Sequence, residues 1–156
     1  MNVFVQPTGR RIDPFGDPPG EALILNRPLS AWQHDALVGA GLTPVDRLLP
    51  PCLVIPDALF TTSGALRAFV DGAAGRDAVL VLKQSVYGKN SVPVQPGVTP
   101  CEQGWRFEEI RFVSGRGEPP VDVVIDPDEQ VVKMPLPTHY VGSGEIEIPF
   151  PRHPLM

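Results

Sequence analysis

Proline is the residue type that most constrains what this chain can form. Among its 156 residues are 20 prolines and 15 glycines, and the prolines are dispersed along the whole sequence. Each proline removes a backbone hydrogen-bond donor and fixes one dihedral angle, which excludes long helices. We therefore expect short helices and strands joined by many rigid turns.

The rest of the composition is typical of one globular domain. Hydrophobic residues make up 42% of the chain, which is too apolar for a disordered proline-rich segment. We expect a single domain over residues 1–156, with an α/β part over 1–85 and a β-rich part over 86–156. The apolar, proline-containing end from Pro149 to Met156 also suggests a fragment of a longer protein.

Charge and hydropathy argue against several classes of partner. The formal net charge is −5 and the 13 basic residues are scattered, whereas nucleic-acid binding needs a face rich in lysine and arginine. No apolar run approaches the roughly 20 residues of a membrane helix, and residues 1–6 lack the pattern of a secretion signal. We therefore expect a cytoplasmic protein with no nucleic-acid partner and no membrane partner.

Hydrophobic patterns predict an α/β first half. Strands are expected at Asn2 to Gln6, Cys52 to Ile55 and Ala78 to Leu82. A helix is expected from Ser30 to Gly41, beginning with a capping box formed by Ser30 and Gln33. A second helix is expected from Thr62 to Ala74, capped by a hydroxyl side chain. Two strand-helix-strand steps in succession predict parallel strands.

The second half has the pattern of antiparallel strands. They are expected at Trp105 to Val113, Val121 to Ile125, Val131 to Met134 and Glu145 to Ile148. The adjacent Glu108 and Glu109 break the alternation and predict a bulge, and the turn sequence Asp126-Pro127-Asp128 predicts a hairpin. The expected fold class is thus α/β, with a small, mostly parallel, three-layer-like sheet followed by a β-rich antiparallel half.

Three short segments of the first half follow the order found in one enzyme family. They are Arg11-Ile12-Asp13-Pro14-Phe15, Asn26-Arg27-Pro28-Leu29 and Ala40-Gly41. Over about residues 1–85 the chain resembles the sugar-phosphate nucleotidyltransferases, or pyrophosphorylases. That family has a G-G-x-G-T-R-[LM]-x-P loop, an N-[KR]-P-[LM] segment and a helix that ends in A-G. The segment from Leu53 to Phe60 is similar to the family's strand whose terminal aspartate binds the catalytic metal.

The resemblance implies a set of site residues. Asp57 would be the metal ligand, for Mg²⁺ if the protein is active, and Arg11 would lie near the phosphates of a nucleotide or sugar phosphate. Lys83 follows the third predicted strand, and ligands of open parallel sheets bind beyond the carboxyl ends of strands. Lys83 and Asp57 are therefore candidates to share a crevice. The alternative for Lys83 is a solvated, charged edge of the sheet.

The chain departs from the family where the chemistry would occur. The segment Gln6-Pro7-Thr8-Gly9 holds one glycine in place of the glycine cradle, and Pro7 has no amide to offer a phosphate. The family's lysine falls near Glu21, whose carboxylate would repel a triphosphate. The family also has a further strand and helix before the metal-site strand, where here only Leu42 to Pro51 intervene.

Two functions from different classes follow from this pattern. The first is a nucleotidyltransferase-like domain that has lost catalysis and retains nucleotide or sugar-phosphate binding. The alternative is a non-catalytic structural or protein-interaction domain that mediates self-association or contact with another domain. Whether the chain is an enzyme stays open; an active form would be a sugar-phosphate nucleotidyltransferase.

Other chemistry-bearing residues carry weaker patterns. Cys52 and Cys101 have no CxxC spacing and are expected to be reduced thiols, and the three histidines are too widely separated to predict a metal triad. Asp126 and Asp128 are interpreted as turn residues in preference to a second metal ligand. The segment Ser114-Gly115-Arg116-Gly117 is interpreted as a hairpin tip in preference to an anion cradle.

Overall fold

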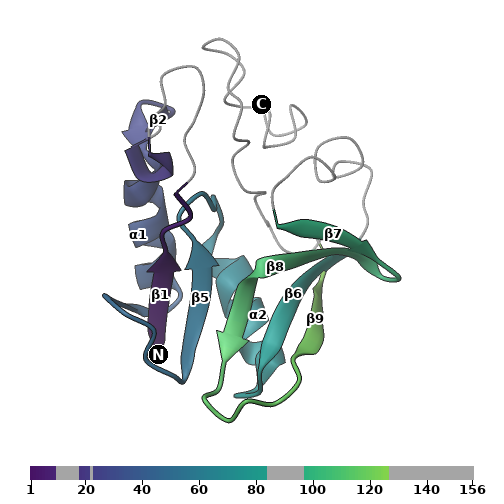
Figure 1. The fold of residues 1–156 in the computed structure, drawn as a ribbon. Coiled ribbons are helices and arrows are strands. Elements are labelled where there is room, and N and C mark those ends of the chain that lie inside the picture. The colour runs from purple at the N-terminus through teal and green to yellow at the C-terminus, as the bar shows by residue number, and fades with distance from the viewer. Residues whose placement is uncertain (10–17, 22, 84–96, 127–156) are drawn as a thin grey trace.

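The described part of the chain forms one mixed sheet with two helices. The computed structural model describes residues 1–9, 18–21, 23–83 and 97–126 (Figure 1). The strands expected from Val131 to Met134 and from Glu145 to Ile148 lie outside these residues, as does most of the predicted hairpin turn after Asp126. The expected α/β fold class is confirmed.

Seven strands of the described residues form the main sheet. They are β1 (Asn2–Gln6), β4 (Thr43–Val45), β5 (Cys52–Pro56), β6 (Ala78–Lys83), β7 (Val98–Cys101), β8 (Gly104–Val113) and β9 (Val121–Ile125). Their spatial order is β4-β1-β5-β8-β6-β9, and β7 pairs with β8 off this path. The remaining elements are the 3-10 turn η1 (Pro19–Glu21), the two-stranded β2 (Leu23–Ile24) and β3 (Arg27–Pro28), and the helices α1 (Leu29–Gly39) and α2 (Ser63–Ala73).

The two halves of the sequence share this sheet. β1 pairs in parallel with both β4 and β5, which confirms the first predicted parallel step. β5 and β6 are not neighbours, because β8 from the second half lies between them and pairs antiparallel with both. β9 then pairs in parallel with the other side of β6. The β-rich half is therefore built into the first half instead of forming a separate layer.

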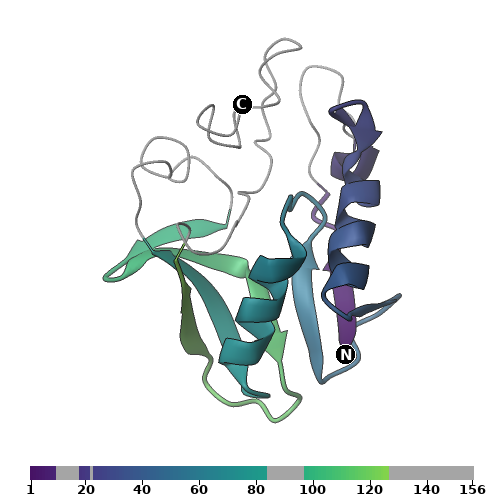
Figure 2. The same ribbon diagram turned by 180° about the vertical axis from the view of Figure 1, so that it is seen from behind.

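The core lies on one face of the sheet. Alternate strand residues such as Val3, Leu53 and Leu80 form a single buried cluster with Leu37 of α1 and Phe69 of α2. The ribbon seen from both sides places α1 and α2 on this same face (Figures 1 and 2). Neither helix has the length and apolar content that a membrane crossing requires, and the described residues contain no other α-helix.

The second helix begins and ends as the sequence predicts. Thr62 is its N-cap and accepts a hydrogen bond from the Ala65 amide at 3.3 Å. The chain leaves the helix through Ala74 and Gly75, both at positive φ. The predicted apolar stripe of Leu66 to Ala73 is buried in the core.

The first helix corrects the sequence prediction. α1 begins at Leu29 after Pro28, and no side-chain hydrogen bond caps it, so the predicted capping box is wrong. Gln33 instead turns inward, where it is 6% exposed. Its Nε2 donates to the carbonyl oxygens of Asp57 at 3.0 Å and Leu59 at 2.7 Å. These carbonyls follow β5 and have no strand partner. They need a hydrogen-bond donor, and the Gln33 side chain supplies it instead of capping the helix.

The predicted bulge in β8 is confirmed. Phe107 pairs with Leu80 and Arg111 pairs with Val79, so three residues of β8 are accommodated between two adjacent residues of β6. The amide of Glu108 within this bulge donates to the Gly97 carbonyl at 2.8 Å. A bulge bends its strand and redirects the side chains beside it, which matters for the groove described below.

Replacing Gln33 with methionine should destabilise the fold by about 2 kcal/mol, because two carbonyls that are partly or fully buried lose their donor. Urea unfolding of the Gln33→Met variant measures this loss. The matched control is His34→Met on the exposed face of the same helix, for which we expect less than about 0.5 kcal/mol. Equal stability of the two variants would contradict the role assigned to Gln33.

Candidate functional site

Two of the candidate residues of the sequence, Asp57 and Lys83, lie at the carboxyl edge of the parallel strands, the upper edge of the sheet in Figure 1. Thr8 and Gly9 follow β1, and Asp57 follows β5. Lys83 is the last residue of β6. Arg11, the proposed phosphate contact, lies outside the described residues.

Asp57 is held by contacts on three sides. Its carboxylate Oδ1 accepts a hydrogen bond from the Thr8 hydroxyl at 2.7 Å. Its amide donates to the Gln6 carbonyl at 3.1 Å, and its own carbonyl accepts from Gln33. The ends of β1 and β5 and a side chain from within α1 thus fix this partly buried aspartate, and the charge-assisted bond from Thr8 orients its carboxylate.

Lys83 is paired with an aspartate at the end of the neighbouring strand β9. Its Nζ lies 3.8 Å from Oδ2 of Asp126, which follows β9. β8 separates β5 from β6, so the strands that carry Asp57 and Lys83 are two strand spacings, about 10 Å, apart. With its side chain 61% exposed, the ammonium of Lys83 faces solvent beside Asp126. The shared crevice with Asp57 stays a prediction.

One carboxylate, Asp57, lies where a magnesium ligand is expected. Phosphate-bound Mg²⁺ usually takes one or two protein carboxylates and completes its octahedron with phosphate oxygens and water. Asp57 therefore fits the smallest such donor set, and it would hold the ion together with the phosphates of a ligand. The described residues contain no group of three or more His, Cys, Asp or Glu side chains suited to a metal ion.

The turn after β1 provides little of a phosphate cradle. Gly9 has a φ of +73°, and a Cβ built there meets no atom within 4 Å, so backbone is open to solvent at this point. Pro7, two residues earlier, has no amide. Glu21 lies exposed at the end of η1.

The two cysteines are not linked to each other. Cys52 is buried in β5 and Cys101 is partly buried at the end of β7, and both are free thiols, as predicted. Burial raises the pKa of the Cys52 thiol, and the nearby Arg111 charge offsets this in part. The Cys52 thiol is therefore protonated at neutral pH and behaves as a small core residue.

The structure also forms a groove that the sequence analysis did not predict. It lies toward the amino end of β6, has a volume of about 550 Å³, and is bounded by β6, β8, β9 and the connection from β8 to β9. Its charged lining residues are Asp77, Arg106, Glu108, Arg111, Glu118 and Asp122. The bulge at Glu108 was the one feature of the sequence that pointed to this groove. Whether a bulge opens a groove depends on which strands lie beside β8, and the sequence does not show that.

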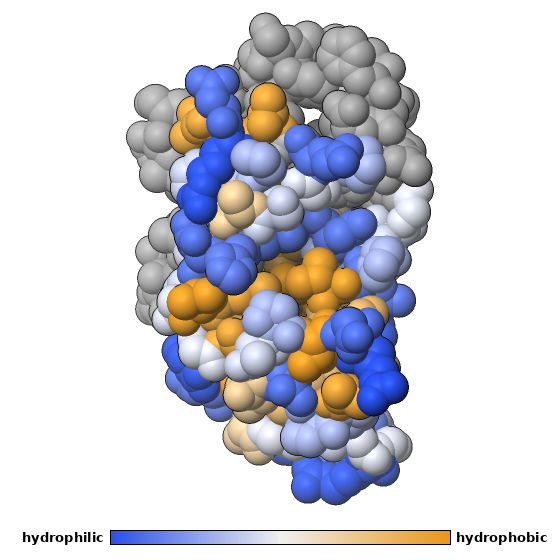
Figure 3. Space-filling model, turned by 90° about the vertical axis from the view of Figure 1, so that its left-hand side faces the viewer, coloured by the Kyte–Doolittle hydropathy of each residue, from blue (hydrophilic) through white to orange (hydrophobic). Residues whose placement is uncertain are grey.

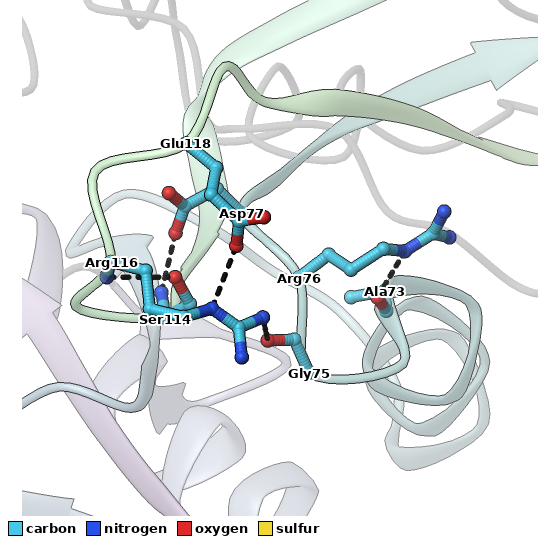
Figure 4. Close-up of polar contacts among 7 residues, drawn as sticks. All are labelled: Ala73, Gly75, Arg76, Asp77, Ser114, Arg116 and Glu118. Atoms are coloured by element: carbon cyan, nitrogen blue, oxygen red, sulfur yellow. Dashed lines mark hydrogen bonds and ion pairs between the residues drawn. The ribbon is translucent and has the colours of Figure 1, made fainter.

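A network centred on Asp77 holds the wall of this groove (Figure 4). Asp77 Oδ1 accepts from the Ser114 amide at 2.5 Å, and the Asp77 carbonyl accepts from the Val121 amide at 2.9 Å. Arg116 donates to the Gly75 carbonyl at 3.1 Å and to Glu118 Oε1 at 2.8 Å. The connection from β8 to β9 is thereby fastened at both of its ends to the residue that precedes β6.

This network corrects the interpretation of residues 114–117 as a hairpin tip. β8 and β9 are not paired with each other, since each pairs with β6 from one side. The connection therefore crosses the amino end of β6. Its Ser114 amide does meet an anion, but that anion is the chain's own Asp77. Hydrogen bonds from the Ser114 backbone and side chain lower the pKa of the Asp77 carboxyl, with smaller contributions from the Glu118 backbone and the Arg116 charge.

No family model, no curated protein and no solved structure matches this chain. The resemblance to nucleotidyltransferases therefore depends on the sequence motifs and on the order of elements described above.

The Asp77 network should make stability depend on pH. Because the folded-state pKa of Asp77 is lowered, its stabilisation is complete above the unfolded pKa of about 4 and is lost as the pH falls through the folded value. Asp77→Asn should therefore unfold at lower urea concentration than the wild type at pH 7, and the difference should shrink toward pH 3. The control Asp46→Asn changes an exposed carboxylate. A difference for Asp77→Asn that does not vary with pH would contradict this account.

Proposed function

We propose that this chain is a nucleotidyltransferase-like domain that has lost nucleotidyl transfer and retains binding of a nucleotide or sugar phosphate at the carboxyl edge of its sheet. The observation that carries the proposal is the position of Asp57. It directly follows β5, beside the end of β1, and its carboxylate is oriented by Thr8. That is the place the resemblance assigns to the metal-binding aspartate.

The order of helices and strands supports the proposed relation to the nucleotidyltransferases. The chain forms a first strand and then a helix, which follows Asn26-Arg27-Pro28-Leu29 and is followed by Ala40-Gly41. Next come a strand with Asp57 directly after it, a second helix and a third strand. The short β4, parallel to β1, also occupies part of the interval from Leu42 to Pro51. The family has a further strand in that interval, although no helix follows β4 here.

The chemistry of the edge supports binding. A phosphate there would meet magnesium on Asp57 and the exposed ammonium of Lys83, and it could approach the backbone at Gly9 without a side chain in between. Both positive groups compensate phosphate charge.

Residues at the same edge of the sheet also support the proposed loss of nucleotidyl transfer. Charge that develops on a reacting triphosphate must be met by donors that are already in place, and one missing donor lowers kcat by about 100-fold to 1000-fold. Pro7 stands where the cradle needs an amide, and Glu21 stands near the place of the family's lysine. These replacements remove donors or add negative charge.

Thermal unfolding in the presence of magnesium with dTTP or UTP tests the retained binding. At ten times Kd the wild type should gain about 1.4 kcal/mol, or roughly 3 °C or more in Tm. Asp57→Asn should lose the magnesium-dependent part of this gain, whereas Asp46→Asn should keep all of it. No stabilisation of the wild type by either triphosphate would refute binding and leave the interaction function.

Pyrophosphate release from the same triphosphates with glucose 1-phosphate tests the loss of catalysis. We expect no turnover above that of a reaction without protein. Turnover that Asp57→Asn abolishes would show instead that the edge is catalytic.

An interaction domain is the second candidate, and the surface near α1 and β4 favours it. Met1, Val38, Leu48 and Leu49 are large hydrophobic residues exposed by 38% to 57%, and they belong to or adjoin β1, α1 and β4. Apolar residues gather at the middle of this side of the molecule (Figure 3). Sedimentation velocity over a range of concentrations separates the candidates, because association that Val38→Asp abolishes would favour the interaction function.

A further inference from the structure

The groove beside β6 is distinct from the proposed nucleotide site. It lies toward Asp77 and Ala78, at the start of β6, whereas Lys83 ends that strand at the opposite edge. Its volume of about 550 Å³ is within the range of small-molecule sites, about 300 to 1,000 Å³. The groove is therefore large enough for a small-molecule ligand.

The bulge in β8 and the fastened connection after it give the groove its shape. The residues of β8 beside the bulge, Arg106 and Arg111, line it together with Val79 of β6. The connection is fixed by Asp77, and Gly115 packs so closely that an added Cβ would lie 3.0 Å from Pro50. Because its wall is held in place from two sides, the groove is preformed, which lowers the entropic cost of binding.

The carboxylates of the groove are already engaged. Asp77 accepts from the Ser114 amide, Asp122 is paired with Arg106 at 2.8 Å, and Glu118 is paired with Arg116 at 2.8 Å. Glu108 accepts from the neutral Thr99 hydroxyl at 3.0 Å. Asp122 and Glu118 are therefore compensated by arginines, whereas Asp77 and Glu108 accept from neutral donors and keep most of their charge.

Arg111 is the groove cation that has no anionic partner in the described part of the chain. It is partly buried, and within the described residues no hydrogen bond or ion pair engages its guanidinium. A guanidinium stays charged at all relevant pH values and presents a planar fork that matches a carboxylate with two hydrogen bonds. Partial removal from water without a partner is unfavourable for such a charge, and an anionic ligand would relieve it.

We propose that this groove binds a small organic monocarboxylate with an apolar body. The carboxylate pairs with Arg111, and the apolar body lies against Val79, Val113 and Pro120, which line the same groove. A doubly charged phosphate is disfavoured, because it meets twice the repulsion from Glu108 and leaves the apolar lining uncovered. The proposal does not depend on the nucleotide site.

Titration of the ¹⁵N-labelled full chain with hexanoate tests the proposal. Saturable chemical-shift changes should appear at the amides of Val79, Val113 and Asp122. Arg111→Gln should weaken binding about tenfold or more, and Arg111→Lys, which keeps the charge and loses the fork, should fall between. The matched control is Arg47→Gln, an exposed arginine outside the groove, which should leave the affinity unchanged.

A substitution that should increase hexanoate affinity provides a second test. Glu108→Gln removes a repelling charge and should tighten hexanoate binding about twofold. Hexylamine, with the same apolar body and a positive charge, should cause none of these shifts in the wild type.

Three results would overturn the proposal. They are no saturable shifts with millimolar hexanoate, equal affinity of the wild type and the folded Arg111→Lys and Arg111→Gln variants, and a response to inorganic phosphate as strong as that to hexanoate. The last result would assign the groove to a bare anion. Loss of triphosphate binding at Asp57 would leave these outcomes unaffected, so the two proposals fail independently.

Discussion

The hydrogen bonding of β8 to two strands at once is the constraint on which the rest of this structure depends. β8 pairs antiparallel with β5 through Cys52 to Val54 and with β6 along most of its length. Without it, β5 and β6 would each leave a row of backbone groups unpaired in the middle of the sheet. Its inward residues Phe107, Ile110 and Phe112 also complete the core against α2. One strand from the second half thus joins the two parallel parts of the sheet, β4-β1-β5 and β6-β9.

This insertion determines where chemistry is available at both ends of the sheet. At the carboxyl edge it places β6 two spacings away from β5, so Lys83 meets Asp126 while Asp57 meets Thr8. Toward the other end the same strand carries its bulge over Val79 and opens the groove in which Arg111 lies. The position of β8 therefore accounts both for the separation of Lys83 from Asp57 and for the groove in which Arg111 has no ion pair among residues that the structure describes.

Five ion pairs engage ten charged side chains of the described residues within the chain. The Asp77 carboxylate accepts a hydrogen bond from the Ser114 amide, which is therefore not available to an external anion, and Arg116 fastens the same connection to Gly75. Gln33 donates hydrogen bonds to the carbonyls after β5, and so fixes the position of α1 relative to Asp57. Asp57 and Arg111 form no such ion pair among the described residues, and Arg111 lines the groove.

The sequence by itself determined what depends on near neighbours. The strands β1, β5 and β6, the Thr62 cap, the stop at Gly75 and the bulge at Glu108 all follow from side chains a few residues apart, and the place of Asp57 after β5 follows from strand length. Only the tertiary structure decided the role of Gln33, whose acceptors lie 24 and 26 residues away, and the course of residues 114–117 across the end of β6. It also decided the order of strands and the groove around Arg111, because an apolar strand pattern records that a strand is buried and does not record which strand lies beside it.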